Sequence, residues 1–324
     1  MTNYFLVFSN GEKIGDGIIK LTLLYEINRR FPTHKIIWVA NGTTVYANRL
    51  KSFSSKYIYK VIEHANLNPF FWKSKSKNKF LNNSHFEYIF DTQKAVPRTI
   101  ALKRLAHDFF ISNSAKGLLS RSSINLTKRD KKYYLDELID LLNSIKKIDH
   151  DKVFKVPIPE KLDKALNNFF PNKIKYLGIA PGAGEQNKIW PLENFIKVAK
   201  EFERKLIKIV WFLGPEEEGI RSKIINTFPN ALYPEESING FSSLEIIMGS
   251  TKYLSCALAN DSGISHILST KHCPLIKLFG PKNALKFTPQ NIFFRNITSS
   301  EFHSDDVKVI PVNHVISAID KFII

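Results

Sequence analysis

Hydrophobic and polar positions follow two different periods along the chain. Short and almost continuous apolar runs, such as residues 36–40 and 209–213, alternate with longer stretches whose apolar residues recur every three or four positions. The first pattern indicates strands buried on both faces, and the second indicates amphipathic helices. Strands that alternate with helices predict βαβ units and parallel sheets.

The first half of the chain contains three such strands, at residues 4–9, 34–40 and 86–91. A long surface helix is expected at 131–147. Residues 72–80, WKSKSKNKF, alternate lysine with small polar residues and predict a solvated loop that could contact an anion. A further helix is expected to begin near Asp16, with an apolar face formed by Ile18, Ile19, Leu21, Leu24 and Ile27.

A proline-containing, charged stretch at 149–174 predicts a connection between two domains. A second alternation of elements follows it. Strands are expected at 175–180, 207–213, 253–258 and 275–279, and helices from Pro191, at 217–228, from about Gly263 and at 312–322.

This order of elements predicts two doubly wound α/β domains that face each other across a cleft. The first domain is assigned to residues 1–165 and the second to 174–311, and the last helix, within 312–324, could pack back across the boundary. In such sheets, ligands bind beyond the carboxyl ends of the strands.

Composition excludes several classes of protein. The 324 residues are 44% apolar and 24% charged, which is too apolar for a disordered chain. The apolar runs are too short to span a membrane, and the first residues lack the pattern of a secretory signal. Two cysteines, Cys256 and Cys273, fit buried positions in a reducing compartment. We therefore expect a cytoplasmic protein.

Positive charge is concentrated in one half. Residues 1–170 contain 29 basic and 15 acidic residues, whereas 171–324 contain 18 and 15. This asymmetry indicates an anionic partner for the first half, such as nucleic acid, anionic lipid or a phosphorylated acceptor. The alternative is a composition bias on the solvated surface, because most of the basic residues are lysines.

The first candidate site segment is 181–191, PGAGEQNKIWP, which follows a predicted strand. Gly182 and Gly184 would let a ligand approach the backbone closely. Lys188 lies in the loop beyond the strand end, where its ammonium group could reach a phosphate. The alternative is a glycine-rich turn with a surface lysine. Asn187 stands where a dinucleotide fingerprint needs its third glycine, so that fingerprint is excluded.

The second candidate segment is 259–267, ANDSGISHI, again between a strand and a helix. The backbone N–H groups of Ser262 and Gly263 would point out of the helix start, where a pyrophosphate could bind. Asp261 suits either helix capping or a ligand contact. His266 lies on the same helix face as Ser262, where packing is the more common role.

The third candidate segment is 10–17, NGEKIGDG, after the first predicted strand. It places Asp16 at a helix start that faces the predicted cleft. A carboxylate near helix N–H groups stays ionised and could accept a proton. Taken alone, N-capping is the more common explanation for an aspartate at this position.

In this order, the three segments resemble glycosyltransferase family 9, the heptosyltransferase-like enzymes of lipopolysaccharide assembly. The resemblance covers essentially the whole chain, although residues 50–150 match poorly. A weaker match is DTQ at 91–93, where Lys94 replaces a glycine of the family's D-x-Q-G pattern. The principal matching stretches are IGDG at 14–17, RRFP at 29–32, APGA at 180–183, KIWP at 188–191, NDSGISH at 260–266 and FGP at 279–281.

The resemblance implies a GT-B fold with two Rossmann-like domains, the acceptor bound by the first and a nucleotide-sugar by the second. It implies inverting sugar transfer, with heptose from ADP-heptose as the default donor. Asp16 would deprotonate the acceptor hydroxyl, and Lys188 would neutralise the leaving diphosphate. Acceptor contacts are expected from Lys13, Gly15 and Gln93.

The implied donor site belongs to the second domain. Asp261 would bind the hydroxyls of the donor sugar, and Ser262 and Gly263 would bind the pyrophosphate. Glu218, or nearly as well Glu217, would contact the ribose. The remaining expected donor contacts are Pro181, Gly182, Ala183, Gly184 and His266.

No metal or other cofactor is expected. The only Asp-x-Asp triplet, Asp149-His150-Asp151, lies among lysines in the linker and fits a solvated turn better than a metal site. The basic first domain fits an anionic glycolipid acceptor, with peripheral contact to an anionic inner-leaflet membrane.

Three alternatives remain open at this stage: another GT-B enzyme such as a nucleotide-sugar epimerase, a catalytically altered nucleotide-sugar-binding protein, and a basic polyanion- or nucleic-acid-binding protein. No nucleic acid is expected, because the pattern offers no recognition motif.

Overall fold

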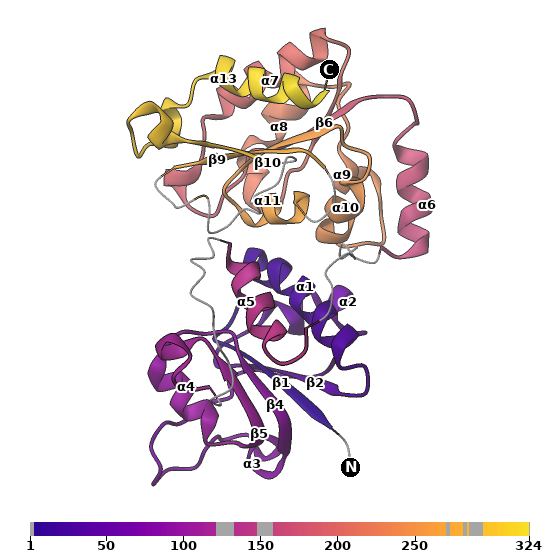
Figure 1. Ribbon diagram of the computed structural model, residues 1–324. Helices are drawn as coiled ribbons and strands as arrows, with labels where there is room; N and C mark the ends of the chain where they lie inside the picture. Colours follow the sequence, from indigo (N-terminus) through magenta and orange to yellow (C-terminus); the bar gives the residue numbers. More distant parts are fainter. Residues whose placement is uncertain are drawn as a thin grey trace. The chain divides into compact units, whose positions relative to one another are not determined.

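The computed structural model describes residues 3–120, 133–147, 158–269, 273–280, 284 and 294–323. The chain folds into two compact units, Met1–Phe154 and Lys155–Ile324. Each unit is built around one parallel sheet (Figure 1). The predicted α/β class with two doubly wound domains is therefore confirmed. Residues 149–157 of the expected linker, which include the Asp149-His150-Asp151 triplet, lie outside the described residues.

The first unit contains a five-stranded sheet in the order β3-β2-β1-β4-β5, in which all neighbours are parallel. The strand order reverses between β1 and β4, which makes the carboxyl ends of these two strands the place where a ligand is expected. The elements are β1 (Tyr4–Ser9), α1 (Ile14–Arg30), β2 (Lys35–Ala40), α2 (Lys51–Ser54), β3 (Ile58–Ile62), α3 (Lys79–Asn83), β4 (His85–Asp91), α4 (Val96–Lys103), β5 (Ala106–Ser112) and α5 (Tyr134–Asn143).

A buried arginine joins two helices of this unit. Arg30, at the end of α1, is 1% exposed. Its guanidinium donates hydrogen bonds to Asn143 Oδ1 at 2.8 Å and to the Lys146 carbonyl oxygen at 3.0 Å, and it pairs with Glu26. Arg30 of the RRFP stretch thus has a structural role, because it fixes α1 against α5 (Figure 1).

The second unit contains a parallel sheet in the order β10-β9-β8-β6-β7, with its reversal between β6 and β8. Its elements are α6 (Glu160–Phe169), β6 (Tyr176–Ala180), α7 (Leu192–Arg204), β7 (Lys208–Trp211), α8 (Glu218–Thr227), α9 (Pro234–Ser237), α10 (Ser243–Ser250), β8 (Cys256–Asn260), α11 (Gly263–Leu268), β9 (Leu275–Phe279), β10 (Phe294–Thr298) and α13 (Val312–Ile323).

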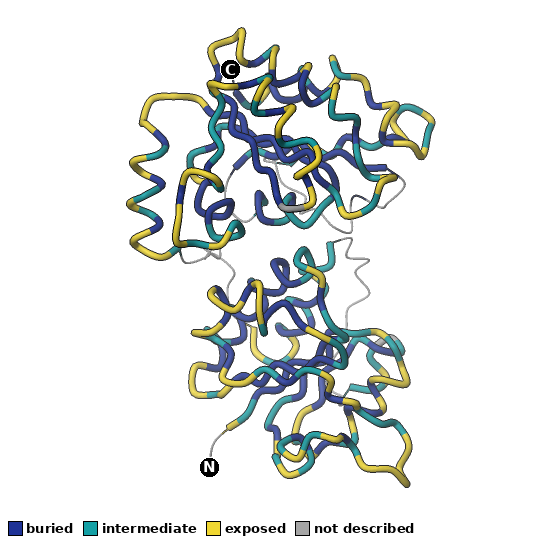
Figure 2. Tube along the Cα trace, turned by 180° about the vertical axis from the view of Figure 1, so that it is seen from behind, coloured by how far each residue is buried: buried dark blue, intermediate teal, exposed yellow. Residues whose placement is uncertain are grey.

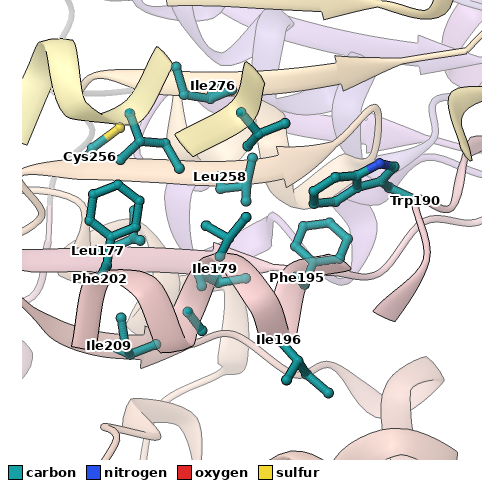
Figure 3. Packing of buried hydrophobic residues seen from close by; sticks show 14 of the residues in the cluster. Leu177, Ile179, Trp190, Phe195, Ile196, Phe202, Ile209, Cys256, Leu258 and Ile276 are labelled. Carbon is teal, nitrogen blue, oxygen red and sulfur yellow. The ribbon is translucent and has the colours of Figure 1, made fainter. Parts of the chain in front are cut away.

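The core of the second unit lies between its sheet and α7, α8 and α13. Alternate residues of the central strands, such as Leu177, Ile179 and Leu258, pack with Trp190 and Phe195 (Figure 3). The central strands are buried on both faces, as the continuous dark blue trace shows (Figure 2). This burial explains why their sequences are apolar without alternation.

The domain boundary differs from the one expected from sequence. The first domain was predicted to reach residue 165, but α6 belongs to the second unit, where it contacts α10. The last helix, α13, belongs to the second unit. The apolar face of α13, with Val315 and Ile319, packs on α7, β8 and β9 because it completes the core of the second unit.

Two further observations concern the cysteines and the length of the helices. Cys256 and Cys273 are free and buried, and burial raises the pKa of both thiols. Within the described ranges, none of the helices combines the length and apolarity needed to cross a bilayer.

Candidate functional site

Most of the predicted site residues lie at the two points of strand reversal, and Glu217 and Glu218 follow the neighbouring edge strand β7. In the first unit, Asp16 and Gln93 follow the neighbouring strands β1 and β4. In the second unit, the predicted donor segments 181–191 and 259–267 follow β6 and β8, which are also neighbours. The structure therefore brings the two donor segments together at one edge of a sheet.

A buried asparagine connects the two donor segments. Asn260 is fully buried. Its side-chain amide donates to the Pro181 carbonyl oxygen at 2.6 Å, and its side-chain oxygen accepts from the Trp190 N–H at 3.2 Å. Trp190 is anchored in turn by its indole N–H, which donates to the Ile310 carbonyl oxygen at 3.0 Å. These bonds fix the loop that carries Lys188.

A cavity of about 450 Å³ opens beside this loop. Its size is that of a small-molecule site. Five residues predicted to bind the donor, Pro181 to Gly184 and Glu217, contribute to its wall. The full lining is Pro181, Gly182, Ala183, Gly184, Gln186, Ile189, Trp190, Leu192, Glu216, Glu217, Gly219 and Ile220.

The two carboxylates expected to contact the ribose differ in position and exposure. Glu217 lines the cavity and is 9% exposed, and burial raises its pKa. Glu218 begins α8, where its exposed side chain pairs with Arg221 at 2.9 Å. The geometry therefore favours Glu217 over Glu218, the reverse of the order expected from sequence.

Gly182 lies against the end of the Glu217 side chain. A Cβ atom at residue 182 would collide with the Glu217 carboxylate, whereas a Cβ at Gly184 would meet nothing within 4 Å. We expect Gly182→Ala to weaken nucleotide binding, because the Glu217 carboxylate must leave its place, and to change the stability of the fold little, because the displaced atoms are the end of a flexible side chain. Gly184→Ala, the matched control, should change stability by less than about 0.5 kcal/mol. Thermal unfolding and nucleotide titration of both variants test this, and wild-type behaviour of Gly182→Ala would contradict it.

A charged cluster lies next to the cavity loop. Asp261 is buried and pairs with two lysines, with Lys188 Nζ 3.5 Å from Oδ2 and Lys277 Nζ 3.1 Å from Oδ1. Lys188 also pairs with Glu185 at 3.1 Å. Two ammonium groups thus share the buried Asp261 carboxylate, and with Glu185 the cluster holds two positive and two negative charges.

The sequence analysis did not identify Lys277. This residue lies in β9, on the face opposite Ile276 and Leu278, and its side chain is 2% exposed. Burial lowers its pKa to about 8, and Asp261 partly opposes that effect. The one available signal was a lysine inside an otherwise apolar strand, LIKLF, because a buried lysine needs a partner.

Asp261 does not cap α11, contrary to one of its two expected roles. Ser262, not Asp261, occupies the N-cap position, so the Asp261 carboxylate is available to the lysines. The Ser262 N–H donates to Ser265 Oγ at 3.3 Å, which leaves the N–H groups from Gly263 onwards to face outward from the helix start. His266 lies in this helix, and burial, with the charges of Lys277 and Lys188, lowers its pKa. It is therefore neutral.

The predicted catalytic base lies in the first turn of α1. The helix begins at Ile14 with Lys13 in the N-cap position, and Asp16 is its third residue. Asp16 is therefore not the N-cap, and the capping explanation of this residue is wrong. Lys13 is exposed, while Gly15 and Asp16 are half-buried at the helix start.

A second buried lysine lies one turn after Asp16. Lys20 is 3% exposed, donates to Ser9 Oγ at 3.2 Å and pairs with Glu12 at 3.6 Å. Burial lowers the pKa of Lys20, whereas the carboxylates of Glu12, Asp16 and Asp91 attract its proton. This polar cluster, also missed from sequence, places a cation close enough to interact with Asp16.

The DTQ stretch forms a rigid turn after β4. Asp91 is 1% exposed and accepts hydrogen bonds from Thr99 Oγ1 at 2.7 Å, Ser112 Oγ at 3.0 Å and the Gln93 N–H at 2.8 Å. Burial raises its pKa, and these bonds oppose the rise. Asp91 therefore positions Gln93, which is half-buried at the carboxyl edge of the sheet.

Among the described residues, no group of three or more histidine, cysteine or acidic side chains is arranged to hold a metal ion.

The family model for glycosyltransferase family 9 (heptosyltransferase) matches residues 76–310. The chain belongs to glycosyltransferase family 9. It is therefore a glycosyltransferase.

Known relatives agree with this assignment over nearly the full length. The lipopolysaccharide core heptosyltransferase OpsX of Haemophilus influenzae is 21% identical over 288 residues, which are 86% of this chain and 79% of OpsX. A family 9 glycosyltransferase from Veillonella parvula superposes with a TM-score of 0.72 at 16% identity, covering 100% of this chain and 98% of the other. Escherichia coli heptosyltransferase WaaC with ADP gives 0.68 at 14% identity, covering 98% and 99%. The fold is thus GT-B, with two Rossmann-like domains.

Proposed function

We propose that this enzyme transfers a sugar, with heptose from ADP-heptose as the default donor, to a lipopolysaccharide-core or related anionic glycan acceptor. The transfer proceeds with inversion and without a metal ion. The similarity to OpsX and to WaaC supports the substrate class. The observation that carries the proposal is the Lys188–Asp261–Lys277 cluster beside a cavity of about 450 Å³ at the β6–β8 strand reversal.

The donor would divide between the cavity and the cluster. The nucleoside enters the cavity, where Gly182 lets the backbone approach it and the Glu217 carboxylate accepts hydrogen bonds from the ribose hydroxyls. The diphosphate lies at Lys188 and at the N–H groups from Gly263. Asp261 then accepts hydrogen bonds from hydroxyls of the donor sugar.

The reaction would be a single displacement. The acceptor oxygen attacks the anomeric carbon, and its proton passes to the Asp16 carboxylate. The bond between that carbon and the diphosphate oxygen breaks on the opposite face, so the configuration inverts. Negative charge develops on the nucleoside diphosphate, and the Lys188 and Lys277 ammonium groups stabilise it. These two cations supply the charge that a divalent metal ion supplies in other transferases.

The basic first unit supports an anionic acceptor. We propose that the enzyme works on the cytoplasmic face of the inner membrane, held there peripherally. Basic residues near an anionic leaflet each contribute on the order of 1 kcal/mol. No nucleic acid takes part in this scheme.

The function is tested by release of nucleoside diphosphate and by the mass of the glycan product. The enzyme is incubated in EDTA with ADP-heptose and a heptose-free lipopolysaccharide core. Metal-independent growth of the acceptor by one heptose is the expected result. Donor binding without any product would instead favour a catalytically altered binding protein.

Lys277 gives nucleotide binding a dependence on pH. Because burial lowers its pKa to about 8, the ammonium is charged below that pH and neutral above it. Affinity for ADP should therefore be highest below pH 8 and fall by about tenfold at pH 9.5. Lys277→Met should bind ADP weakly at pH 7 and lack this step, while Lys197→Met, on the exposed face of α7, should retain it. Calorimetric titrations across this range measure the effect, and a step preserved in Lys277→Met would contradict it.

The same pKa shift predicts a change in stability. Between about pH 8 and pH 10.5, unfolded chains hold a proton on Lys277 that folded chains lack. The unfolded state binds more protons in that window, so the contribution of this residue to the free energy of unfolding rises with pH. Lys277→Met should remove this part of the pH profile.

A further inference from the structure

Three consecutive aromatic residues in the first unit have no place in its core. Phe70, Phe71 and Trp72 are 49%, 82% and 65% exposed. They lie in the segment from Asn66 to Lys79, between β3 and α3, which we call the aromatic tip segment. Water-exposed rings are individually common, but a contiguous group of this size marks an interaction surface.

The three rings pack on one another. Phe70 stacks on Trp72 with centroids 4.9 Å apart, and Phe71 meets Trp72 edge-on at 4.8 Å. One side of this small cluster faces solvent, since Phe71 is more than four-fifths exposed. The cluster is therefore a preformed apolar surface.

The backbone beneath the rings is held in place. Arg104 donates hydrogen bonds to the carbonyl oxygens of Asn68, Phe71 and Lys73, at 2.6, 3.2 and 2.7 Å. The Asn68 N–H donates to the Lys75 carbonyl oxygen at 3.0 Å, and the buried Ser76 hydroxyl donates to the Ala65 carbonyl oxygen. A surface fixed in advance loses little conformational entropy when it binds.

The charge around the rings has one sign. Lysines follow the rings at 73, 75, 77 and 79, and no acidic residue occurs between Glu63 and Glu87. Three of these lysines are exposed, and Lys73 lies over the Phe70 ring at 5.8 Å. Contact with a second copy of this surface would bring like charges together, so the arrangement favours an anionic partner.

The tip segment is separate from the proposed acceptor site. Arg104 lies two residues before β5, so the rings lie near the amino end of that strand. Asp16 and Gln93 follow the carboxyl ends of β1 and β4, at the opposite edge of the same sheet (Figure 1). A change at the tip can therefore be tested without disturbing the site.

We propose that the aromatic tip segment docks on an anionic lipid bilayer, with its rings at the level of the headgroups and its lysines against the lipid phosphates. Tryptophan and phenylalanine rings flanked by lysines match the interfacial zone of a bilayer. A single-stranded nucleic acid would need free ring faces, but Phe70 and Trp72 cover one face of each other. The inference deepens the membrane contact proposed above and does not depend on the sugar that is transferred.

Trp72 provides its own signal for the test. The other three tryptophans, Trp38, Trp190 and Trp211, are at most 1% exposed, so a change in exposed tryptophan fluorescence reports Trp72. The full chain is mixed with phosphatidylcholine vesicles and with vesicles that also contain phosphatidylglycerol. We expect a blue shift, and quenching by brominated acyl chains, with the anionic vesicles. The shift should weaken as salt is raised.

Variants distinguish the contribution of the aromatic rings to vesicle binding from that of the lysines. Phe71→Ser with Trp72→Ser should lower sedimentation with anionic vesicles by on the order of tenfold or more. Lys75→Gln with Lys77→Gln should lower it by roughly fivefold for each lysine near the surface. Lys51→Gln with Lys56→Gln, which removes two exposed lysines elsewhere in the unit, is the matched control and should bind like wild type. Circular dichroism checks that each variant folds.

Several outcomes would overturn the docking proposal. Unchanged Trp72 fluorescence with every vesicle would do so, as would vesicle binding that survives loss of the rings. Binding of an oligonucleotide through the same lysines, without vesicle binding, would replace lipid by nucleic acid. Nucleotide titration of the same samples keeps the two proposals apart, because ADP binding without vesicle binding defeats only the docking surface. Vesicle binding without ADP binding defeats only the proposed donor site.

Discussion

Asp16→Asn is expected to lower the turnover number by about 10²- to 10⁴-fold, the usual contribution of a general base. Asparagine preserves the shape of the side chain but cannot accept the proton of the acceptor hydroxyl. Affinity for the donor nucleotide should stay within about twofold of wild type, because the donor residues belong to the second unit. Turnover is followed by release of nucleoside diphosphate, and affinity by calorimetry.

The matched control is Asp108→Asn, which removes a half-exposed carboxylate of β5 that pairs with His85. Its turnover should remain close to wild type. Asp16 also attracts the proton of the buried Lys20, so thermal unfolding must accompany the assay. A folded Asp16→Asn enzyme that keeps more than about a tenth of its turnover would rule out this residue as the base.

Lys188→Ala is expected to reduce the turnover number by about 10²-fold and to weaken nucleotide binding as well. The Lys188 side chain is 13% exposed and its Nζ lies 3.5 Å from Asp261 Oδ2, so its removal leaves that carboxylate with Lys277 alone. The diphosphate would then meet one cation in place of two. Kinetics at saturating donor separate the effect on the leaving group from the effect on binding.

Two comparisons make the Lys188 result specific. Lys188→Arg keeps the charge and should recover part of the lost binding, although the planar guanidinium fits a phosphate differently. Lys197→Ala, in the exposed part of α7, should have no effect. Equal loss in Lys188→Ala and Lys197→Ala would indicate a general electrostatic effect and would contradict a direct contact.

The central parts of both sheets were predictable from sequence. The bounds of β1 and β9 match the expected strands, and those of β2, β4 and β6 differ by one residue at the start. These strands are buried on both faces, so their residues are almost all apolar. The strands β3, β5 and β10 were missed because they lie at sheet edges, where residues such as Tyr59 and Phe109 are exposed and the pattern is broken.

Each predicted donor segment could be located from the sequence because it directly follows an apolar strand. The loops after β6 and β8 carry most of the predicted donor residues, and the strand order brings these loops together. The sequence analysis preferred Glu218, whereas Glu217 lines the cavity, because the direction of each side chain depends on where α8 begins. The roles assigned to these residues stay predictions.

The pairing of Lys277 with Asp261 could not be predicted from the sequence. Asp261 lies 16 residues before Lys277, and the pairing exists only because β8 and β9 are adjacent. Likewise, Lys20 can be buried because Glu12 and Ser9 converge on it from the preceding loop and strand. Buried charges of this kind depend on tertiary contacts, which hydrophobic periodicity does not encode.

Calorimetric titration with ADP, UDP, GDP and CDP in the presence of EDTA tests the central claim most directly. We expect one nucleotide, ADP by default, to bind selectively without metal and to lose most of its affinity in Lys188→Ala. That result would identify the base of the donor as well as the site. If none of the four binds, or if Lys188→Ala binds like wild type, the assignment of the cavity and the lysine cluster to a nucleotide-sugar is contradicted.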